Sequence, residues 1–403
     1  MTQVPLPLAE ILTAAENAAP VKSIAVVAAD LRERFTASSV SFLFLDLVGR
    51  QVVRITETIA ARRDRGAEHI PLADSPYEEA LRTQRLTLIP EDDAYRVIAP
   101  VTNRGDAIGL LELTLPEAGP EVLEQVSQAA HALAYIVVTD RRFTDLYLWG
   151  QRTRAVNLAA EIQQQLLPSS PTCEAAQFVL AAVLVPADSV GGDSYDYTLD
   201  HDTLHLSITD AMGHEVDSAL MATLIVSASR KARRAFRSLA EQARHTHEAL
   251  LEHMPGALTT GQLLRLSLGD GRLRLVNAGH PWPLLLRDGE VEEVTLEIDP
   301  PFGFPFPVEH RVQDLALRPG DRLVLYTDGM QERAAEKLDL PALIRATADD
   351  HPREVVRTLA ATVSELCGGH LKDDASVMCL DWHGPDDRTR RTHAGADVRT
   401  ERR

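Results

Sequence analysis

Cysteine is scarce in this chain. Only three of the 403 residues are cysteine, and Cys173, Cys367 and Cys379 lie far apart without the spacing of a metal-binding motif. An odd, scattered set of this kind provides no disulfide framework, so we expect a reducing, cytoplasmic setting. No cysteine precedes Cys173, which excludes a thioether-linked bilin from the N-terminal region.

Long apolar runs are also missing. The longest that we find, from Phe178 to Ala187, is too short to span a bilayer. The N-terminal residues MTQVPLPLAE lack the basic region of a signal peptide. We therefore predict a soluble protein without a membrane partner.

Positive charge is in deficit. The formal net charge is −18, which argues against a nucleic-acid partner because phosphate contacts need a basic face. One basic run, RKARRAFR from Arg230 to Arg237, is the exception. We interpret it as a solvated helix face with charges paired at i and i+4, and docking of an acidic partner or a phosphoprotein is the alternative.

The chain has the composition of a globular protein, with 45% hydrophobic and 25% charged residues. A length of 403 residues predicts two or three domains. Helical spacing from Ile24 to Phe35 is followed by the strand-like runs SVSFLFLDL and QVVRIT. Further on, AYRVIAPVT and AIGLLELTL read as a hairpin with its turn at NRGD. We predict a helix-plus-sheet domain over residues 1–118.

Residues 119–168 are predicted to be a helical linker. Apolar residues recur at intervals of three and four positions from Val122 to Ile136 and from Val156 to Leu166. The pattern indicates one long helix, or two joined near Asp140, that ends before Pro168. Its apolar stripe either packs on the chain's own domains or forms a coiled coil in a parallel homodimer, and both readings stay open.

Strands interleaved with helices follow over residues 169–383. A helical pattern covers roughly Val216 to His253, and another lies near Pro352 to Leu366. Sheets covered by helices, an α+β sandwich, are the architecture that this order predicts. Residues 384–403 are too polar to build a core and are expected to be disordered. The runs that read as strands are QFVLAAVLVPA, TLHLSIT, GQLLRLSL, RLRLVNA, PLLLRDG and DRLVLYT.

Aspartates at the edges of short apolar runs are the chain's most informative feature. Any one of them is an ordinary turn or N-cap residue. Together they could meet if a sheet-rich fold gathered its strand ends, and converging carboxylates repel unless a divalent cation lies among them. Oxygen ligands suit Mg²⁺ or Mn²⁺, so a hydrolytic metal site is our first hypothesis. The residues are Asp193 in VGGDSYDY, Asp210 in LHLSITDAMGH, Asp328 in RLVLYTDGM, and Asp373 with Asp374 in LKDDASVMCL.

A series of seven motifs resembles a known family, the stage II sporulation E-like branch of the PPM, or 2C-type, metal-dependent protein phosphatases. The resemblance spans residues 155–382. The motifs, in order, are AEIQQQLLP (160–168), VGGDSYDY (190–197), DAMGH (210–214), NAGHPWPLLL (277–286), PPFGF (300–304), LYTDGMQE (325–332) and KDDAS (372–376).

The resemblance implies an αββα sandwich that hydrolyses phosphoserine or phosphothreonine with two Mn²⁺ or Mg²⁺ ions between its sheets. The two ions would share a water, lower its pKa and neutralise phosphate charge. Asp210 and Asp328 are the residues to which we assign catalysis. The implied metal ligands are Asp193, Asp210, the carbonyl of Ala211, Asp328 and Asp373, with Asp374 as a supporting or alternate ligand.

Some residues depart from the family pattern or stay outside the predicted site. Ser194 stands where an aromatic is common, and Glu215 stands where glycine often follows the histidine. Loop positions held by backbone hydrogen bonds are the simpler interpretation of His214 and His280. Asp196 is expected to be a turn residue or a support for the ligands.

The N-terminal region is similar to a GAF sensory domain, chiefly through YRVIAPVTNRGDAIGLLELTL. This implies a regulatory domain with a small-molecule ligand that the residues do not identify. The linker and phosphatase domains would then follow at 119–168 and 169–383.

The sequence leaves three candidate functions. The first is a phosphatase acting on a phosphorylated anti-anti-sigma-type protein under sensory control, with the substrate implied by the resemblance. The second is a catalytically silent scaffold that binds a phosphoprotein, supported by Ser194 and Glu215. The third is a metal-dependent nucleotide hydrolase, which lacks a GxxxxGK[ST] loop to hold phosphates.

Overall fold

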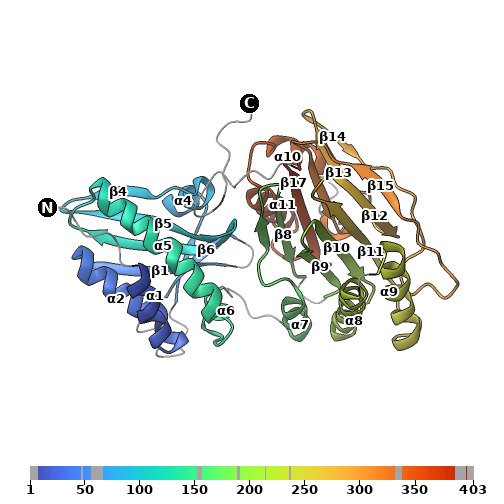
Figure 1. Cartoon of the computed structure of the whole chain (residues 1–403), viewed down its shortest axis with the longest axis horizontal. Coiled ribbons are helices and arrows are strands. Elements are labelled where there is room, and N and C mark those ends of the chain that lie inside the picture. The colour runs from blue at the N-terminus through green and yellow to red at the C-terminus, as the bar shows by residue number, and fades with distance from the viewer. Residues whose placement is uncertain are drawn as a thin grey trace. The chain divides into compact units, whose positions relative to one another are not determined.

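The computed structural model describes residues 8–46, 49–55, 67–151, 157–187, 191–213, 215–235, 237–331, 338–385 and 396. The chain forms two compact units, residues 1–155 and 156–390 with short terminal additions to each (Figure 1). The domain boundaries expected from the sequence remain a prediction. Nearly all of the tail that we expect to be disordered, 384–403, lies outside the described residues.

The first unit is built on one antiparallel sheet in the order β3-β2-β1-β6-β5-β4. The β5–β6 hairpin turns at Arg104 and Gly105, both with positive φ, as NRGD predicts. The strands are β1 (Ser39–Leu45), β2 (Gln51–Ile55), β3 (Glu68–Pro71), β4 (Thr87–Glu91), β5 (Ala94–Asn103) and β6 (Asp106–Leu115).

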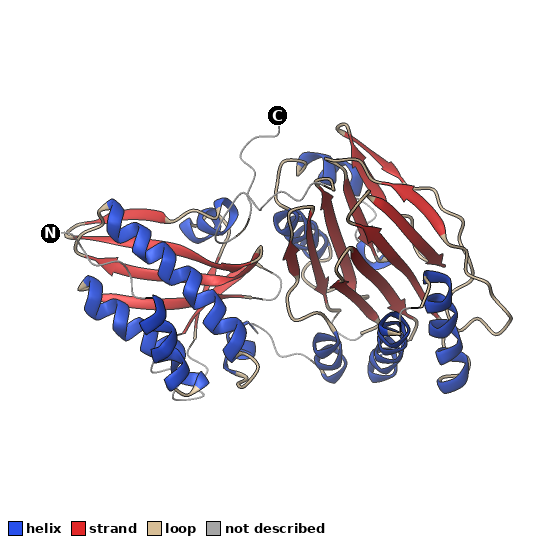
Figure 2. Cartoon of the chain, in the orientation of Figure 1, coloured by secondary structure: helices blue, strands red, loops and turns tan. Residues whose placement is uncertain are grey.

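Helices cover this sheet (Figure 2). One core joins α1, α2 and α5 to β1, β5 and β6, and a second core joins α4 to β1, β2, β5 and β6. The helices are α1 (Leu8–Asn17), α2 (Ser23–Phe35), α4 (Pro76–Thr83), α5 (Pro120–Asp140) and α6 (Leu146–Gln151), with a 3-10 turn η1 (Pro20–Lys22).

The segment expected to be one long helix, or two joined near Asp140, contains the described helices α5, α6 and α7 (Leu158–Leu166). The helix α5 ends at Asp140, near the predicted junction, and buries Val126, Ala129, Leu133 and Ile136 in the core of the first unit. This part of the apolar stripe therefore packs on the chain's own domain. The next described helix of the segment after α6 is α7, which ends before Pro168 as expected.

The second unit contains two sheets. One has the order β15-β12-β11-β10-β9, and the other has the order β14-β13-β16-β17-β8-β7. The strands are β7 (Thr172–Glu174), β8 (Phe178–Val185), β9 (Asp193–Leu199), β10 (Thr203–Ala211), β11 (Thr259–Ser267), β12 (Arg272–Ala278), β13 (Leu284–Arg287), β14 (Glu290–Glu293), β15 (Gln313–Ala316), β16 (Arg322–Tyr326) and β17 (Ala375–Trp382). The six runs read as strands correspond to β8, β10, β11, β12, β13 and β16.

The sheets share one core, to which alternate residues of their strands contribute. Leu204 and Leu264 of the first sheet belong to the same buried cluster as Leu180 and Leu323 of the second. The outer side of the first sheet packs against α8 (Glu215–Arg234) and α9 (Leu239–His253). Next to the second sheet, α11 (Pro352–Leu366) contacts β8 and β17, and α10 (Leu340–Ala346) contacts β13 and β14. The αββα sandwich expected from the sequence is confirmed (Figure 2).

The helical pattern over Val216–His253 is divided in two. Ser238 caps α9 by accepting a hydrogen bond from the amide of Glu241, whose side chain bonds back to Ser238. This capping box starts a new helix after the turn that follows α8. Within the part of the chain that the structure describes, no helix combines the length and hydropathy that crossing a membrane requires.

Candidate active site

Two of the predicted aspartates face each other across neighbouring strands. Asp193 begins β9 and Asp210 lies near the end of β10, and the antiparallel register pairs them directly. Gly192 precedes Asp193, and a Cβ at this position would overlap the carbonyl oxygen of Ala211. Glycine is therefore needed at position 192 for the two strand ends to approach so closely.

The other sheet contributes the remaining aspartates at adjacent strand ends. Asp328 opens the 3-10 turn η2 (Asp328–Gln331) after β16, while Asp373 and Asp374 precede β17, which pairs with β16. The hydroxyl of Thr327 donates a 2.6 Å hydrogen bond to Asp193 Oδ2 and accepts one from the Ser376 amide. These bonds join the acidic ends of the two sheets.

Asp374 is buried and serves as an acceptor for several donors. Its Oδ1 accepts from the amide of Ala187 at 2.8 Å, and its Oδ2 accepts from the amides of Gly192 and Asp193 at 3.0 and 3.3 Å. The side chain of Gln163 on α7 donates to the same Oδ2 at 2.5 Å and to the carbonyl of Asp193 at 3.0 Å. The Asp374 carboxylate thus fixes the segment that delivers Asp193.

The carboxyl groups of these aspartates lie close enough for their charges to raise the pKa of Asp193 and of Asp210. Burial raises the pKa of Asp210 to about 7, with further increases from the charges of Asp328, Asp373 and Asp374. Burial and the charges of Asp210 and Asp374 raise the pKa of Asp193 well above its usual value. Burial also raises the pKa of Asp374, although its N–H donors offset part of that effect. Such a cluster favours any ligand that brings positive charge.

The donor set fits a hard divalent cation, because it consists of carboxylate oxygens with the Ala211 carbonyl nearby. Asp193 is buried, Asp210 and Asp373 are half-buried, and Asp328 is exposed. Among the described residues, however, no group of three or more His, Cys, Asp or Glu side chains is arranged to hold one ion together. The aspartates are therefore neighbours in space whose side chains do not form a closed ligand shell.

The residues that depart from the family pattern take different positions. Ser194 points away from the Asp193 face of β9, as strand alternation requires, and its hydroxyl lies 2.7 Å from that of Thr209. Glu215 begins α8, but its side chain is outside the described part of the structure, as is all of His214.

His280 is held in place as a loop residue. Asn277 bonds to both its backbone amide and its carbonyl, and the Thr260 hydroxyl lies 3.0 Å from its Nδ1. Burial lowers the pKa of His280 to about 3. The imidazole is therefore neutral at physiological pH and does not carry positive charge toward the acids.

Asp196 is not a turn residue, and the basic run does not pair chiefly along its own helix. Asp196 is a buried residue of β9 that accepts from Arg230 at 2.8 Å and from Arg233 at 2.9 Å. These two ion pairs connect α8 to the sheet. Among the described side chains of the run, Arg237 pairs with Glu241 at i and i+4, but Arg237 lies beyond the end of α8 at Arg234.

Sequence reasoning missed three residues that support the acids. Gln163, Thr327 and Ser376 lie within the motifs that carry the resemblance, but their types give no sign of a role. Thr327 directly precedes Asp328 and Ser376 follows Asp374 by two residues, and this proximity was the signal that could have found them. For Gln163 the sequence offered only its place in a family motif.

The chain is similar to known proteins over the region that holds most of these aspartates. Residues 200–383 match the family model described as Stage II sporulation protein E (SpoIIE), a segment that holds Asp210, Asp328, Asp373 and Asp374 but not Asp193. Phosphoserine phosphatase RsbU of Bacillus subtilis (strain 168) is 23% identical over 297 residues, covering 68% of this chain and 85% of RsbU. Phosphoserine phosphatase RsbP of the same organism is 27% identical over 240 residues, covering 57% of this chain and 58% of RsbP.

The chain therefore spans most of RsbU but little more than half of RsbP. Among solved structures, the SiaA-PP2C domain of Pseudomonas aeruginosa is 24% identical, covers 56% of this chain and 93% of its own, and has a TM-score of 0.48. Residues 200–383 therefore form a phosphatase domain of the SpoIIE type, similar to the phosphoserine phosphatases RsbU and RsbP.

Proposed function

We propose that the second unit hydrolyses phosphoserine or phosphothreonine on a regulatory partner protein. The observation that carries the proposal is the meeting of Asp193 and Asp210 from one sheet with Asp328, Asp373 and Asp374 from the other. Hydrolysis of a phosphate ester requires that negative charge be neutralised where the phosphate binds, and a cluster of acids does this only with cations.

We assign the cation ligands to four aspartates and one backbone carbonyl. Asp193, Asp210, Asp328, Asp373 and the Ala211 carbonyl would hold two Mn²⁺ or Mg²⁺ ions. When bound, such ions lower the pKa of water and neutralise the charge of phosphate oxygens. Asp374 is better described as a positioning residue, because N–H donors already occupy both of its oxygens.

The partner and the regulation are further parts of the proposal. The curated relatives RsbU and RsbP are phosphoserine phosphatases by name, which supports a phosphorylated protein as the substrate. An anti-anti-sigma-type protein is the partner that the resemblance suggests. We also propose that the first unit is a GAF-like regulatory domain with a small-molecule ligand, that the chain is a homodimer, and that it acts in the cytoplasm.

The silent-scaffold alternative has less support. One of its two sequence features, Ser194, faces away from Asp193, and its hydroxyl pairs with Thr209. A serine in this place does not alter the groups around the acids. The other feature, Glu215, gives no structural argument for either function.

Phosphate release tests the proposal. The full chain is incubated with Mn²⁺ and a phosphoserine protein, and inorganic phosphate is measured over time. Asp210→Asn and Asp328→Asn should each lose more activity than the roughly 10–100-fold that removal of a supporting residue costs.

Asp288→Asn is the matched control, because Asp288 is an exposed turn residue with a φ of 52°, a conformation that asparagine accepts. Its activity should equal that of the wild type. Full activity in both Asp210→Asn and Asp328→Asn would refute the assigned site.

A further inference from the structure

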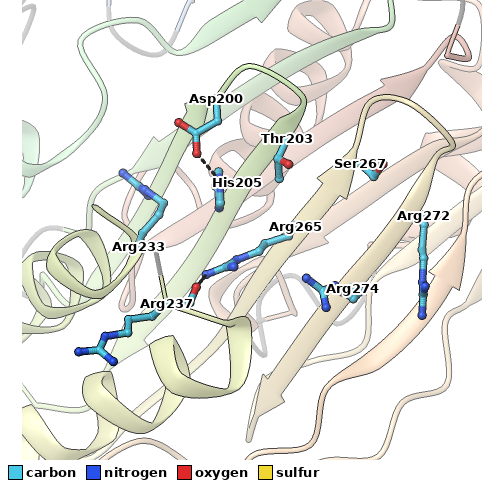
Figure 3. A pocket seen from close by; sticks show the side chains of 9 residues that line it. All are labelled: Asp200, Thr203, His205, Arg233, Arg237, Arg265, Ser267, Arg272 and Arg274. Atoms are coloured by element: carbon cyan, nitrogen blue, oxygen red, sulfur yellow. Dashed lines mark hydrogen bonds and ion pairs between the residues drawn. The ribbon is translucent and has the colours of Figure 1, made fainter. Parts of the chain in front are cut away.

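A second charged site lies at the opposite end of β10 from the acids. A cavity of about 240 Å³ opens there, and five arginines line it together with one carboxylate among the described residues, that of Asp200 (Figure 3). The arginines are Arg233, Arg237, Arg265, Arg272 and Arg274. Thr203, which also lines it, is seven residues from Asp210, or about 23 Å along an extended strand. The cavity is therefore separate from the aspartate cluster.

Strand register places one histidine and two arginines side by side. His205 of β10 pairs with Arg265 of β11, and Arg265 pairs with Arg274 of β12. The row crosses the outer side of the first sheet, where the last turn of α8 brings Arg233 nearby (Figure 3). On its other side Arg274 pairs with Asp314 of β15, so one carboxylate faces the row while Arg265 and Arg274 lie directly opposite each other. Like charges opposite each other destabilise a sheet, and an anion bound between these two guanidinium groups would relieve that repulsion.

Carboxylates balance only part of the positive charge. Arg233 pairs with Asp196, Arg237 with Glu241, and Arg272 with Asp314. Within the described ranges, Arg265 and Arg274 form no ion pair. The side chain of Asp200 is 59% exposed and lies 3.0 Å from Nε2 of His205.

Arg265 presents an unused donor. One of its terminal nitrogens donates to the carbonyl of Arg237 at 2.7 Å and to Oε1 of Gln242 at 2.8 Å, which fixes the guanidinium. Its Nε is buried and has no acceptor among the described residues. Burial and the charges of Arg274 and Arg233 lower the pKa of Arg265 below its usual value, as expected for a cation that an anion would stabilise.

We propose that this arginine pocket binds a phosphate group. Guanidinium groups bind phosphate oxygens through paired hydrogen bonds, and a fixed guanidinium loses little entropy in doing so. The cavity is smaller than the 300–1,000 Å³ typical of sites that enclose a whole drug-sized ligand. It therefore suits inorganic phosphate or the phosphate of a phosphomonoester whose remainder stays outside.

Calorimetric titration of the full chain with inorganic phosphate tests the inference. EDTA in a low-salt buffer keeps divalent ions away from the aspartates, so binding does not depend on the proposed phosphatase site. Wild type should bind phosphate saturably, and Arg265→Gln and Arg274→Gln should each weaken binding by about tenfold, the loss expected for one charge-assisted hydrogen bond.

Arg274→Gln guards against misfolding, because Arg274 is exposed and no described side chain bonds to it. Arg244→Gln is the control, since Arg244 lies on the neighbouring helix α9, pairs with Glu248 and does not line the cavity. This variant should bind as the wild type does. No saturable binding by the wild type, or unchanged binding in Arg274→Gln, would overturn the proposal.

Titration with a second compound distinguishes the two possible sources of the phosphate group, a phosphorylated protein segment and a small phosphate compound. A phosphoserine peptide that binds more tightly than inorganic phosphate would indicate a phosphorylated protein segment. Equal affinities would indicate a small phosphate compound. In either case the arginine variants should lose binding in parallel.

Discussion

Removing the Asp374 carboxylate should destabilise the protein without any metal present. Asp374 accepts from the Ala187, Gly192 and Asp193 amides and from the Gln163 side chain. In Asp374→Ala these buried donors lose their acceptor. An unsatisfied buried donor costs about 1–3 kcal/mol, and water entering the space would satisfy some of them, so we expect a loss of about 3–5 kcal/mol.

The isosteric variant Asp374→Asn should lower the free energy of unfolding by a smaller amount. In Asp374→Asn the remaining oxygen can serve the three donors at Oδ2, but the new amide group faces the Ala187 N–H. The expected loss is about 1–3 kcal/mol. Asp373→Ala is the comparison, because half-buried Asp373 accepts a bond from the Asp374 amide, and its removal also relieves repulsion of Asp210. The stability of this variant should change by less than about 1 kcal/mol.

Urea unfolding in EDTA, followed by circular dichroism, measures all three variants. The loss should decrease in the order Asp374→Ala, Asp374→Asn, Asp373→Ala. If Asp374→Ala were as stable as Asp373→Ala, the conclusion that Asp374 positions the Asp193 segment would be wrong.

Two other predictions concern the strand ends. Gly192→Ala places a Cβ against the Ala211 carbonyl and should lower both thermal stability and phosphatase activity. Gly269→Ala is the control, because a Cβ there meets open space, and it should leave both unchanged. Equal thermal midpoints for the two variants would contradict the close approach of Gly192 to Ala211. The folded protein retains the Asp210 proton up to about pH 7, while the unfolded chain releases it near the usual pKa of 3.8. Proton binding by Asp210 therefore stabilises the fold fully below pH 3.8, and this contribution is lost as the pH rises through 7. Thermal midpoints in EDTA should fall from pH 5 to pH 8, and a slope unchanged in Asp210→Asn would exclude this cause.

Local sequence patterns predicted the helices and strands better than they predicted which parts of the chain pack against them. The strand runs and the helix near Pro352–Leu366 follow from apolar periodicity, and β8 and α11 lie where expected. The capping box at Ser238 and Glu241 was a readable signal that the long helical pattern obscured. For helix α5, periodicity identified the buried face but did not say what covers it, and in the structure the core of the first unit covers it.

The site was predictable as a set of residues but not as an arrangement. The motifs identified the aspartates, yet the pairing of Asp193 with Asp210 depends on strand register, which no local pattern specifies. Asp196 shows the same limit, because its partners Arg230 and Arg233 belong to a helix more than thirty positions away. Charge runs predict pairing along their own helix, and here tertiary contacts replaced most of it.

The central claim is that acids from two sheets bind divalent metal at one edge of the sandwich. The most direct measurement is the anomalous difference density of a crystal of the protein soaked in Mn²⁺. We predict peaks between the carboxylates of Asp193, Asp210, Asp328 and Asp373 that disappear in Asp210→Asn crystals. A well-ordered wild-type crystal with no manganese among these side chains would contradict the account.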